Sequence, residues 1–193
     1  GERVRVVSTQ WGWPHLGSVI LDQEVTGPGD RVHQHADVFA VAPYFSVNVY
    51  TDSEASYAAK SVEEILDICA GEVVKNSAIG GLTDINAALA HERGLALVAY
   101  EGGQSCVAVG SVQNNQTIVD LFISANRHPR MRQLYLDDLN GWTTRGGTTF
   151  MQFSHTGGYG RYGCWGLLER QEQDRSISYK WLGIHDWLAT MLD

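Results

Sequence analysis

Apolar residues gather along this chain in four short runs, and the stretches between the runs carry helical spacing. The runs predict β-strands at residues 3–9, 37–45, 95–100 and 148–154. Continuous apolar runs such as residues 95–100 are typical of parallel strands that are covered on both faces. Pro43 has no backbone N–H group, so we expect the second strand to end beside it.

Helical signals separate these strands. Residues 54–70 repeat apolar side chains at helical spacing, and Thr83 is a candidate N-cap for a helix that ends near Gly94. Further helices are expected at residues 16–21, 112–126, 129–146 and 178–191. Alternation of strands and helices predicts an α/β fold with a parallel sheet and right-handed crossovers. We expect one domain over residues 1–193, because no linker, repeat or low-complexity tract interrupts the chain.

Composition narrows the possible functions. The formal net charge of −8 argues against nucleic-acid binding, and no apolar run approaches the roughly 20 residues of a membrane span. No signal peptide is visible at the N-terminus, although the cellular location stays open. Cys69, Cys106 and Cys164 have no metal-binding spacing, so we expect small buried side chains or one reduced thiol near a loop.

The most informative candidate for chemistry is Glu101. It follows the apolar run 95–100 directly, and Gly102 and Gly103 come after it. In barrels of parallel strands the catalytic side chains lie at the carboxyl ends of the strands. A glutamate there is not core filling, because burying an unpaired charge is costly, and the glycines leave room for a sharp turn. The alternative is a strand-ending glutamate that pairs with a neighbouring loop.

The other predicted strands also end in side chains that suit sugar chemistry. A carboxylate, a tyrosine that holds it and aromatic platforms are the mixture that glycoside hydrolysis requires. For each aromatic residue the alternative is packing beneath a loop. Beside Glu101, the candidate residues at or just beyond the strand ends are Gln10, Trp11, Trp13, Tyr44, His155, Tyr159 and Trp165.

Several segments also resemble a known family. VFAVAPYF, LVAYEGGQ, ANRHPRM and FMQFSHTGGYGRYGCWGLLE are similar to the C-terminal half of a bacterial (β/α)8 family. Its members are often labelled cellulose-binding or glycosyl-hydrolase-like, in the style of the large clan of retaining glycosidases. The resemblance implies that Glu101 is the nucleophile, Tyr44 its hydrogen-bonding partner and Trp165 a sugar platform. The implied substrate is a β-linked glucan or oligosaccharide.

The chain also departs from that family. The clan takes its general acid/base from a second glutamate, preceded by asparagine, and this chain has no such pair. Its four β/α units correspond to the fifth to eighth strands, whereas a whole barrel takes about 250 residues. We therefore expect half of a (β/α)8 TIM barrel that a homodimer completes, because a lone half would expose two strand edges. Glu169 and Asp52 are candidate proton donors.

Three other interpretations fit parts of the sequence. His33 and His35, with His15 and His155, suggest a metal site, but no third ligand at suitable spacing accompanies them. We therefore expect neither a metal nor a cofactor. A non-catalytic alternative is a carbohydrate-binding surface that keeps its aromatic platforms without a proton donor. A third alternative is a purely structural half-barrel.

Overall fold

The structure is a computed structural model, and it describes residues 3–9 and 11–191. Its strands are β1 (Val6–Ser8), β2 (Val38–Val41), β3 (Phe45–Val49), β4 (Ala96–Ala99), β5 (Gln104–Ala108) and β6 (Gly147–Phe150). Its α-helices are α1 (Pro14–Leu21), α2 (Glu54–Ala58), α3 (Val62–Ser77), α4 (Leu82–His91), α5 (Gln116–Asn126), α6 (Arg130–Thr144) and α7 (Tyr179–Thr190). Short 3₁₀ helices occupy Val32–His35, Gly110–Asn114 and Arg175–Ile177.

Two compact units divide the chain. Unit 1 comprises Gly1–Tyr44, Lys75–Gly102 and Gly141–Met151. Unit 2 comprises Phe45–Val74, Gly103–Asn140 and Gln152–Asp193. The two units share α3 and α6, each of which begins in unit 2 and ends in unit 1. The single domain expected from the sequence stays a prediction.

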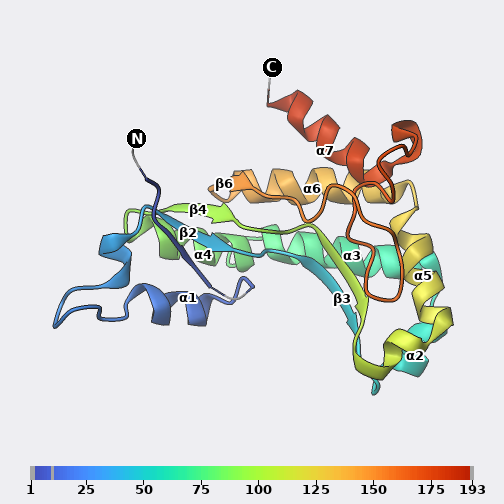
Figure 1. The fold of residues 1–193 in the computed structure, drawn as a ribbon, viewed down its shortest axis with the longest axis horizontal. Coiled ribbons are helices and arrows are strands. Elements are labelled where there is room, and N and C mark those ends of the chain that lie inside the picture. Colours follow the sequence, from blue (N-terminus) through green and yellow to red (C-terminus); the bar gives the residue numbers. More distant parts are fainter. Residues whose placement is uncertain (1–2, 10, 192–193) are drawn as a thin grey trace. The chain divides into compact units, whose positions relative to one another are not determined.

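Unit 1 contains a parallel sheet in the strand order β1-β2-β4-β6, which is also the order along the chain (Figure 1). Val7 pairs with Phe39, and Phe39 pairs with Leu97 on the far side of β2. This arrangement confirms the predicted α/β class and the parallel sheet. β1 and β6 are the two edge strands of this sheet.

The helices of unit 1 cover one face of this sheet. Helical side chains pack there against the row of strand residues that contains Phe39 and Leu97. Side chains alternate between the two faces of a strand, so Val6 and Ser8 lie on the opposite face, and both are exposed. The second face is therefore only partly covered by the chain itself. The core residues on the covered face are Leu21, Phe39, Val41, Ala87, Ala90, Leu95, Leu97, Ala99 and Trp142.

Unit 2 contains a second parallel pair, β3 and β5, with Phe45 opposite Gln104. Helices α2, α3, α5, α6 and α7 contribute side chains to the core around this pair, and its largest buried members include Phe45, Tyr135, Ile65, Leu66 and Met131. Gly183 of α7 lies against the backbone of α6, since an added Cβ would come within 2.4 Å of the Arg132 carbonyl oxygen.

Several predicted boundaries were wrong. The run 37–45 is not one strand, because β2 ends at Val41 and β3 begins only after Pro43 and Tyr44. The final strand ends at Phe150. The Met151 N–H group still donates a hydrogen bond to the carbonyl oxygen of Ala99, but β4 ends at that residue, so the pairing goes no further. The strand β5 was not predicted.

The helical predictions also needed correction. Residues 54–70 form two helices because Ser61 and Glu64 build a capping box at the start of α3. The Ser61 N–H group donates to Glu64 at 2.8 Å and the Glu64 N–H group to Ser61 at 3.2 Å. Thr83 is not the N-cap of α4. That position belongs to Gly81, where a Cβ would come within 2.3 Å of the Lys75 carbonyl oxygen.

Candidate functional site

Glu101 and Tyr44 meet at the carboxyl ends of neighbouring strands in unit 1. Glu101 lies two residues beyond the end of β4, and the backbone N–H of Tyr100 donates to Val41, the last residue of β2, at 3.0 Å. The Tyr44 hydroxyl lies close enough to the Glu101 carboxylate for the two groups to interact through charge and hydrogen bonding. The structure thus brings together the two residues that the resemblance paired, while the roles of both residues stay predictions.

Burial raises the pKa of Tyr44 far above its ordinary value, and the negative charge of Glu101 and their hydrogen bond raise it further. Only 7% of Tyr44 is exposed, whereas Glu101 is half-buried. The phenol therefore stays protonated across the physiological pH range and remains a hydrogen-bond donor to the carboxylate.

Gly102 is required at its position for a reason that the structure makes explicit. A Cβ there would lie 2.5 Å from the Cζ atom of Phe150 on β6. The aromatic ring of β6 thus packs directly on the backbone that follows Glu101. This contact fixes the chain just beyond the carboxylate, and it explains one of the two glycines that make the sequence segment distinctive.

A tight turn at residues 11–13 brings two tryptophans to the same unit. The Trp11 ring meets the Tyr44 ring edge-on, with 5.7 Å between centroids. Trp11 is 41% exposed and Trp13 59% exposed, so neither side chain is core filling. Both residues were predicted to bind substrate, and Trp11 lies one aromatic contact from the Tyr44–Glu101 pair. Gln10, predicted beside them, lies outside the described residues.

Two residues that sequence reasoning missed hold this turn. The Tyr100 hydroxyl accepts a hydrogen bond from the Trp11 N–H group at 3.3 Å. The side-chain amide of Asn86, on α4, donates to the Gly12 carbonyl oxygen at 2.7 Å and to the Leu82 carbonyl oxygen at 2.9 Å. Asn86 gives no sequence signal, because a polar residue within a helix is ordinarily read as solvent-facing.

Glu101 is set apart from the other carboxylates of unit 1. Within the described part of that unit, each of the others is engaged by an arginine, a histidine or a loop N–H group. Such pairing leaves no second carboxylate of unit 1 as an evident proton donor beside Glu101. These paired residues are Asp22, Glu24, Asp30, Asp37, Asp84 and Glu92.

The remaining predicted sugar contacts belong to unit 2. Trp165 donates from its indole to the Tyr162 carbonyl oxygen at 2.9 Å and meets the Phe153 ring edge-on at 5.6 Å. The Tyr159 hydroxyl donates to the Gly166 carbonyl oxygen at 2.9 Å. His155 is exposed, and its ring lies 2.9 Å from the Thr156 hydroxyl. These contacts hold the loop together, and a role in sugar binding stays a prediction.

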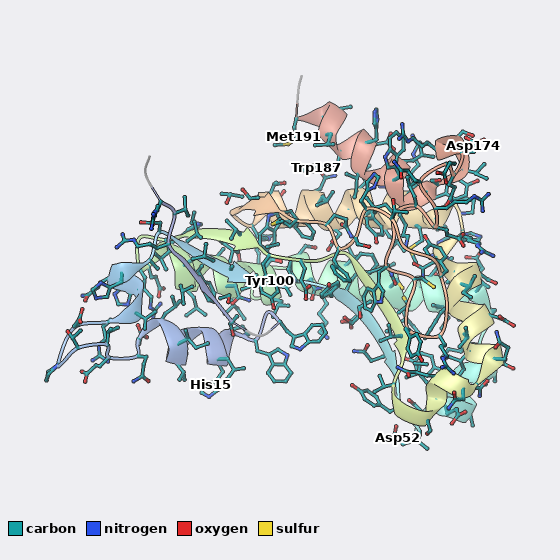
Figure 2. All side chains as sticks on the ribbon, viewed as in Figure 1. His15, Asp52, Tyr100, Asp174, Trp187 and Met191 are labelled. Atoms are coloured by element: carbon teal, nitrogen blue, oxygen red, sulfur yellow. The ribbon has the colours of Figure 1, made fainter. Side chains whose placement is uncertain are left out.

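The two candidate proton donors also lie in unit 2. Arg127 makes a two-pronged ion pair with Glu169, at 2.7 and 2.6 Å, and lowers the pKa of that carboxyl. A carboxyl held ionised in this way is a poor general acid. Asp52 lies in the exposed turn between β3 and α2 (Figure 2).

A buried lysine is the second feature that the sequence did not reveal. Lys180, on α7, is only 1% exposed, and its ammonium donates to Asn126 at 3.1 Å and to the Cys164 carbonyl oxygen at 2.5 Å. Its Nζ atom lies 4.4 Å from the centre of the Tyr159 ring. Burial lowers the pKa of Lys180 to about 7.

His33 and His35 lie on the 3₁₀ helix Val32–His35, and each has its own partner. The His33 ring lies 2.9 Å from the Leu21 carbonyl oxygen, and the His35 ring lies 2.5 Å from Asp30. His15 is exposed on α1 (Figure 2). Across residues 3–9 and 11–191, no three His, Cys, Asp or Glu side chains form a metal-binding cluster.

Among the helices described here, none has the length and apolar character needed to cross a membrane.

Comparisons of the chain with protein-family models, with curated proteins and with solved structures found no match.

Proposed function

We propose that the protein is a glycoside hydrolase that acts on a β-linked glucan, with Glu101 as the nucleophile. The observation that carries the proposal is the placement of Glu101 and Tyr44 beside each other at the carboxyl ends of the neighbouring parallel strands β4 and β2. The edge-on contact of Trp11 with Tyr44 adds an exposed aromatic face to this pair. Aromatic faces of this kind stack on the apolar faces of sugars.

In the proposed reaction, a Glu101 oxygen attacks the anomeric carbon while the bond from that carbon to the leaving oxygen breaks. The leaving oxygen takes a proton from a general acid, and water then hydrolyses the glycosyl-enzyme ester and releases Glu101. The Tyr44 hydroxyl donates to the carboxylate throughout and fixes its orientation. A retaining mechanism needs the second carboxyl group about 5–5.5 Å from the nucleophile.

The proposal includes the assembly. Unit 1 has its strands in chain order, helices on one face and two edges with unpaired backbone, as half of a (β/α)8 barrel requires. A second copy related by a two-fold axis along the barrel would pair β6 of one copy with β1 of the other. The partly covered sheet face, which includes the exposed Val6, would then line the barrel interior.

The second candidate function is carbohydrate binding without catalysis. It is favoured by the pairing of every other described carboxylate in unit 1. In this alternative, Glu101 accepts hydrogen bonds from sugar hydroxyl groups, and Trp11 and Trp13 supply the stacking surface. The third alternative, a half-barrel with only a structural role, predicts neither sugar binding nor turnover.

Turnover of aryl β-glycosides by the wild type and by Glu101→Gln tests the proposed chemistry. The proposal predicts release of chromophore by the wild type and a loss of about 10³-fold or more in the variant, since the nucleophile is removed. A 2-deoxy-2-fluoro aryl glycoside should label only the wild type, as seen by intact-protein mass. Glu92→Gln, at an exposed carboxylate of the same unit, is the matched control. Equal activity in Glu101→Gln and wild type would refute the assignment.

Sedimentation equilibrium tests the proposed assembly. The wild type should be a dimer, and Val6→Asp should give monomers because a charge would enter the barrel interior. Val74→Asp, at a valine with 67% exposure on α3, is the matched control and should leave the dimer intact. A monomeric wild type at all concentrations would exclude the closed barrel.

A further inference from the structure

We infer that Tyr100 and Asn86 are positioning residues that hold the Trp11–Trp13 turn as a preformed stacking surface for a sugar ring beside Glu101. The inference takes the class of ligand, a carbohydrate, from the proposed function. It adds a positioning role for Tyr100, just beyond the carboxyl end of β4, and for Asn86, on α4. It also assigns Trp11 to the position next to the nucleophile.

The backbone of Trp11 is held in an unfavourable conformation. Its φ angle is +56°, in the left-handed region that a bulky side chain rarely adopts. Residues in this region are strained and persist only where the surrounding structure enforces them. A glycine at position 11 would adopt the same backbone without that strain. Trp11 therefore occupies a backbone conformation that is unfavourable for a residue with a bulky side chain.

Three hydrogen bonds enforce the conformation. The Trp11 carbonyl oxygen accepts from the Ala42 N–H group at 2.8 Å, which ties the turn to the end of β2. The Trp11 N–H group donates to the Tyr100 hydroxyl, and the Gly12 carbonyl oxygen accepts from Asn86. The two side chains thus hold consecutive residues of the turn from two different elements.

The burial of Asn86 also indicates that its contact with the turn is structurally important. It is 1% exposed, and its side-chain oxygen has no hydrogen-bond partner within the described residues. A buried amide of this kind is unfavourable unless its other contacts require it. Its amide nitrogen, which donates to Gly12 and Leu82, provides that requirement.

The geometry around Trp11 indicates which sugars fit. The Trp11 and Tyr44 rings are in T-shaped contact, and Tyr44 interacts with Glu101. A sugar ring stacked on the exposed part of Trp11 would therefore lie near the Tyr44–Glu101 pair. Flat stacking requires a pyranose whose C–H groups form a continuous apolar face, as β-linked glucose units provide and axially substituted sugars do not. We therefore assign cello-oligosaccharides as the class of ligand.

Trp11→Gly separates this role from a purely structural one. The variant relieves the strained backbone, so its Tm should equal or exceed that of the wild type. Its affinity for cellopentaose, followed by calorimetry, should fall about tenfold or more because the stacking surface is gone. A residue with only a packing role would show the opposite pattern, with lower Tm and unchanged sugar affinity.

Tyr100→Phe and Asn86→Ala test the two positioning residues. Each should weaken cellopentaose binding about threefold to tenfold, as expected for one hydrogen bond that orders the binding surface. Their effects should combine less than additively, because both act on one turn. Tyr50→Phe, at another exposed tyrosine, is the control and should leave affinity unchanged. Circular dichroism verifies that each variant is folded. If Asn86→Ala does not fold, Tyr100→Phe alone tests the inference.

The outcomes distinguish this inference from the proposed function. Cellopentaose binding that depends on Trp11 and Tyr100, without turnover, would support the inference and refute the hydrolase proposal. Turnover that requires Glu101, with sugar affinity unchanged in Trp11→Gly and Tyr100→Phe, would refute the inference and keep the hydrolase proposal. Absence of cellopentaose binding by the wild type would also overturn the inference.

Discussion

Glu101 in unit 1 and Lys180 in unit 2 are both ionisable side chains that are at least partly buried, but they differ in how far they are buried and in their partners. Lys180 is almost wholly buried, and its ammonium is occupied by an amide oxygen, a carbonyl oxygen and an aromatic face. Glu101 is half-buried, has Tyr44 as a partner and lies in the same unit as two exposed tryptophans. The partners of Lys180 all come from the protein itself, whereas Glu101 stays partly accessible to solvent.

The sheets of the two units differ in the same way. The strands β3 and β5 contribute inward-facing side chains to a core supplied by five helices. In the sheet of unit 1, the row of residues that contains Phe39 and Leu97 packs against helices, whereas Val6 of β1, on the opposite face, is exposed. The proposed chemistry and the proposed dimer contact both concern unit 1, whose Trp11, Trp13 and Val6 side chains are exposed.

The largest expected effect concerns whether the two units are also separate units of stability. Leu97 of unit 1 and Leu66 of unit 2 are both fully buried. Truncation of such a leucine to alanine costs about 2–5 kcal/mol. Leu97→Ala should accelerate amide hydrogen exchange in unit 1 segments such as β2 and β4, and Leu66→Ala should do so in β3 and β5. Equal acceleration throughout the chain in both variants would show that the protein unfolds as a single cooperative unit.

The buried lysine predicts a pH dependence that is specific to unit 2. The pKa of Lys180 is about 7 in the folded protein and 10.5 for an ordinary lysine, so the unfolded chain binds more protons between these values. Stability therefore rises with pH from about 7 to 10, and below pH 7 the whole cost of burying the charge is present.

Lys180→Met removes that cost. Below pH 7 the variant should be more stable than the wild type, with a gain on the order of 3 kcal/mol that declines as the pH rises towards 10. Above pH 10 the wild type should be favoured, because methionine cannot donate to Asn126 and Cys164. Urea unfolding at pH 6, 8 and 10 measures the difference. A stability difference that does not vary with pH would contradict the assigned burial of the charge.

Much of this comparison could be predicted from the sequence because local signals carried it. Apolar runs located the four strands of the sheet in unit 1, and the glycines after Glu101 marked the end of one of them. The family resemblance paired Glu101 with Tyr44, and the structure brings these two side chains together in unit 1. The capping box at Ser61 was also predictable from the sequence, and it marks the start of α3 as a helix separate from α2.

The features that escaped prediction depend on contacts between residues distant in sequence. The strand β5 has no long apolar run, and its first residue is a buried glutamine whose side chain donates to Cys164, 60 residues away. Asn86 reaches Gly12 across 74 residues, and Lys180 reaches Asn126 across 54. Polar residues are usually exposed, so burial of these three becomes evident only when their distant partners are known.

The buried Tyr44 and the half-buried Tyr159 allow a smaller and more selective test. Tyr44→Phe should lower the proposed turnover about tenfold, because the carboxylate loses the hydroxyl that orients it. Tyr159→Phe removes a comparable hydroxyl, which donates to Gly166 in unit 2, and should lower Tm with little change in kcat. Thermal unfolding and aryl glycoside kinetics on both variants measure the contrast. A larger loss of kcat in Tyr159→Phe would move the candidate site towards unit 2.

The smallest expected effect concerns how helices begin in the two units. In unit 2, Asn115 accepts hydrogen bonds from the N–H groups of Thr117 and Ile118 at 3.1 and 3.4 Å and donates to Glu54 at 2.7 Å. In unit 1, α4 begins at Gly81, which has no side chain to cap it. Asn115→Ala should therefore cost about 1 kcal/mol, the usual value for a lost N-cap. Asn115→Asp keeps the capping oxygen but places a second negative charge beside Glu54, so it should recover only part of the loss. Chemical denaturation measures both changes, and full stability in Asn115→Ala would mean that packing alone, as at α4, is enough to start α5.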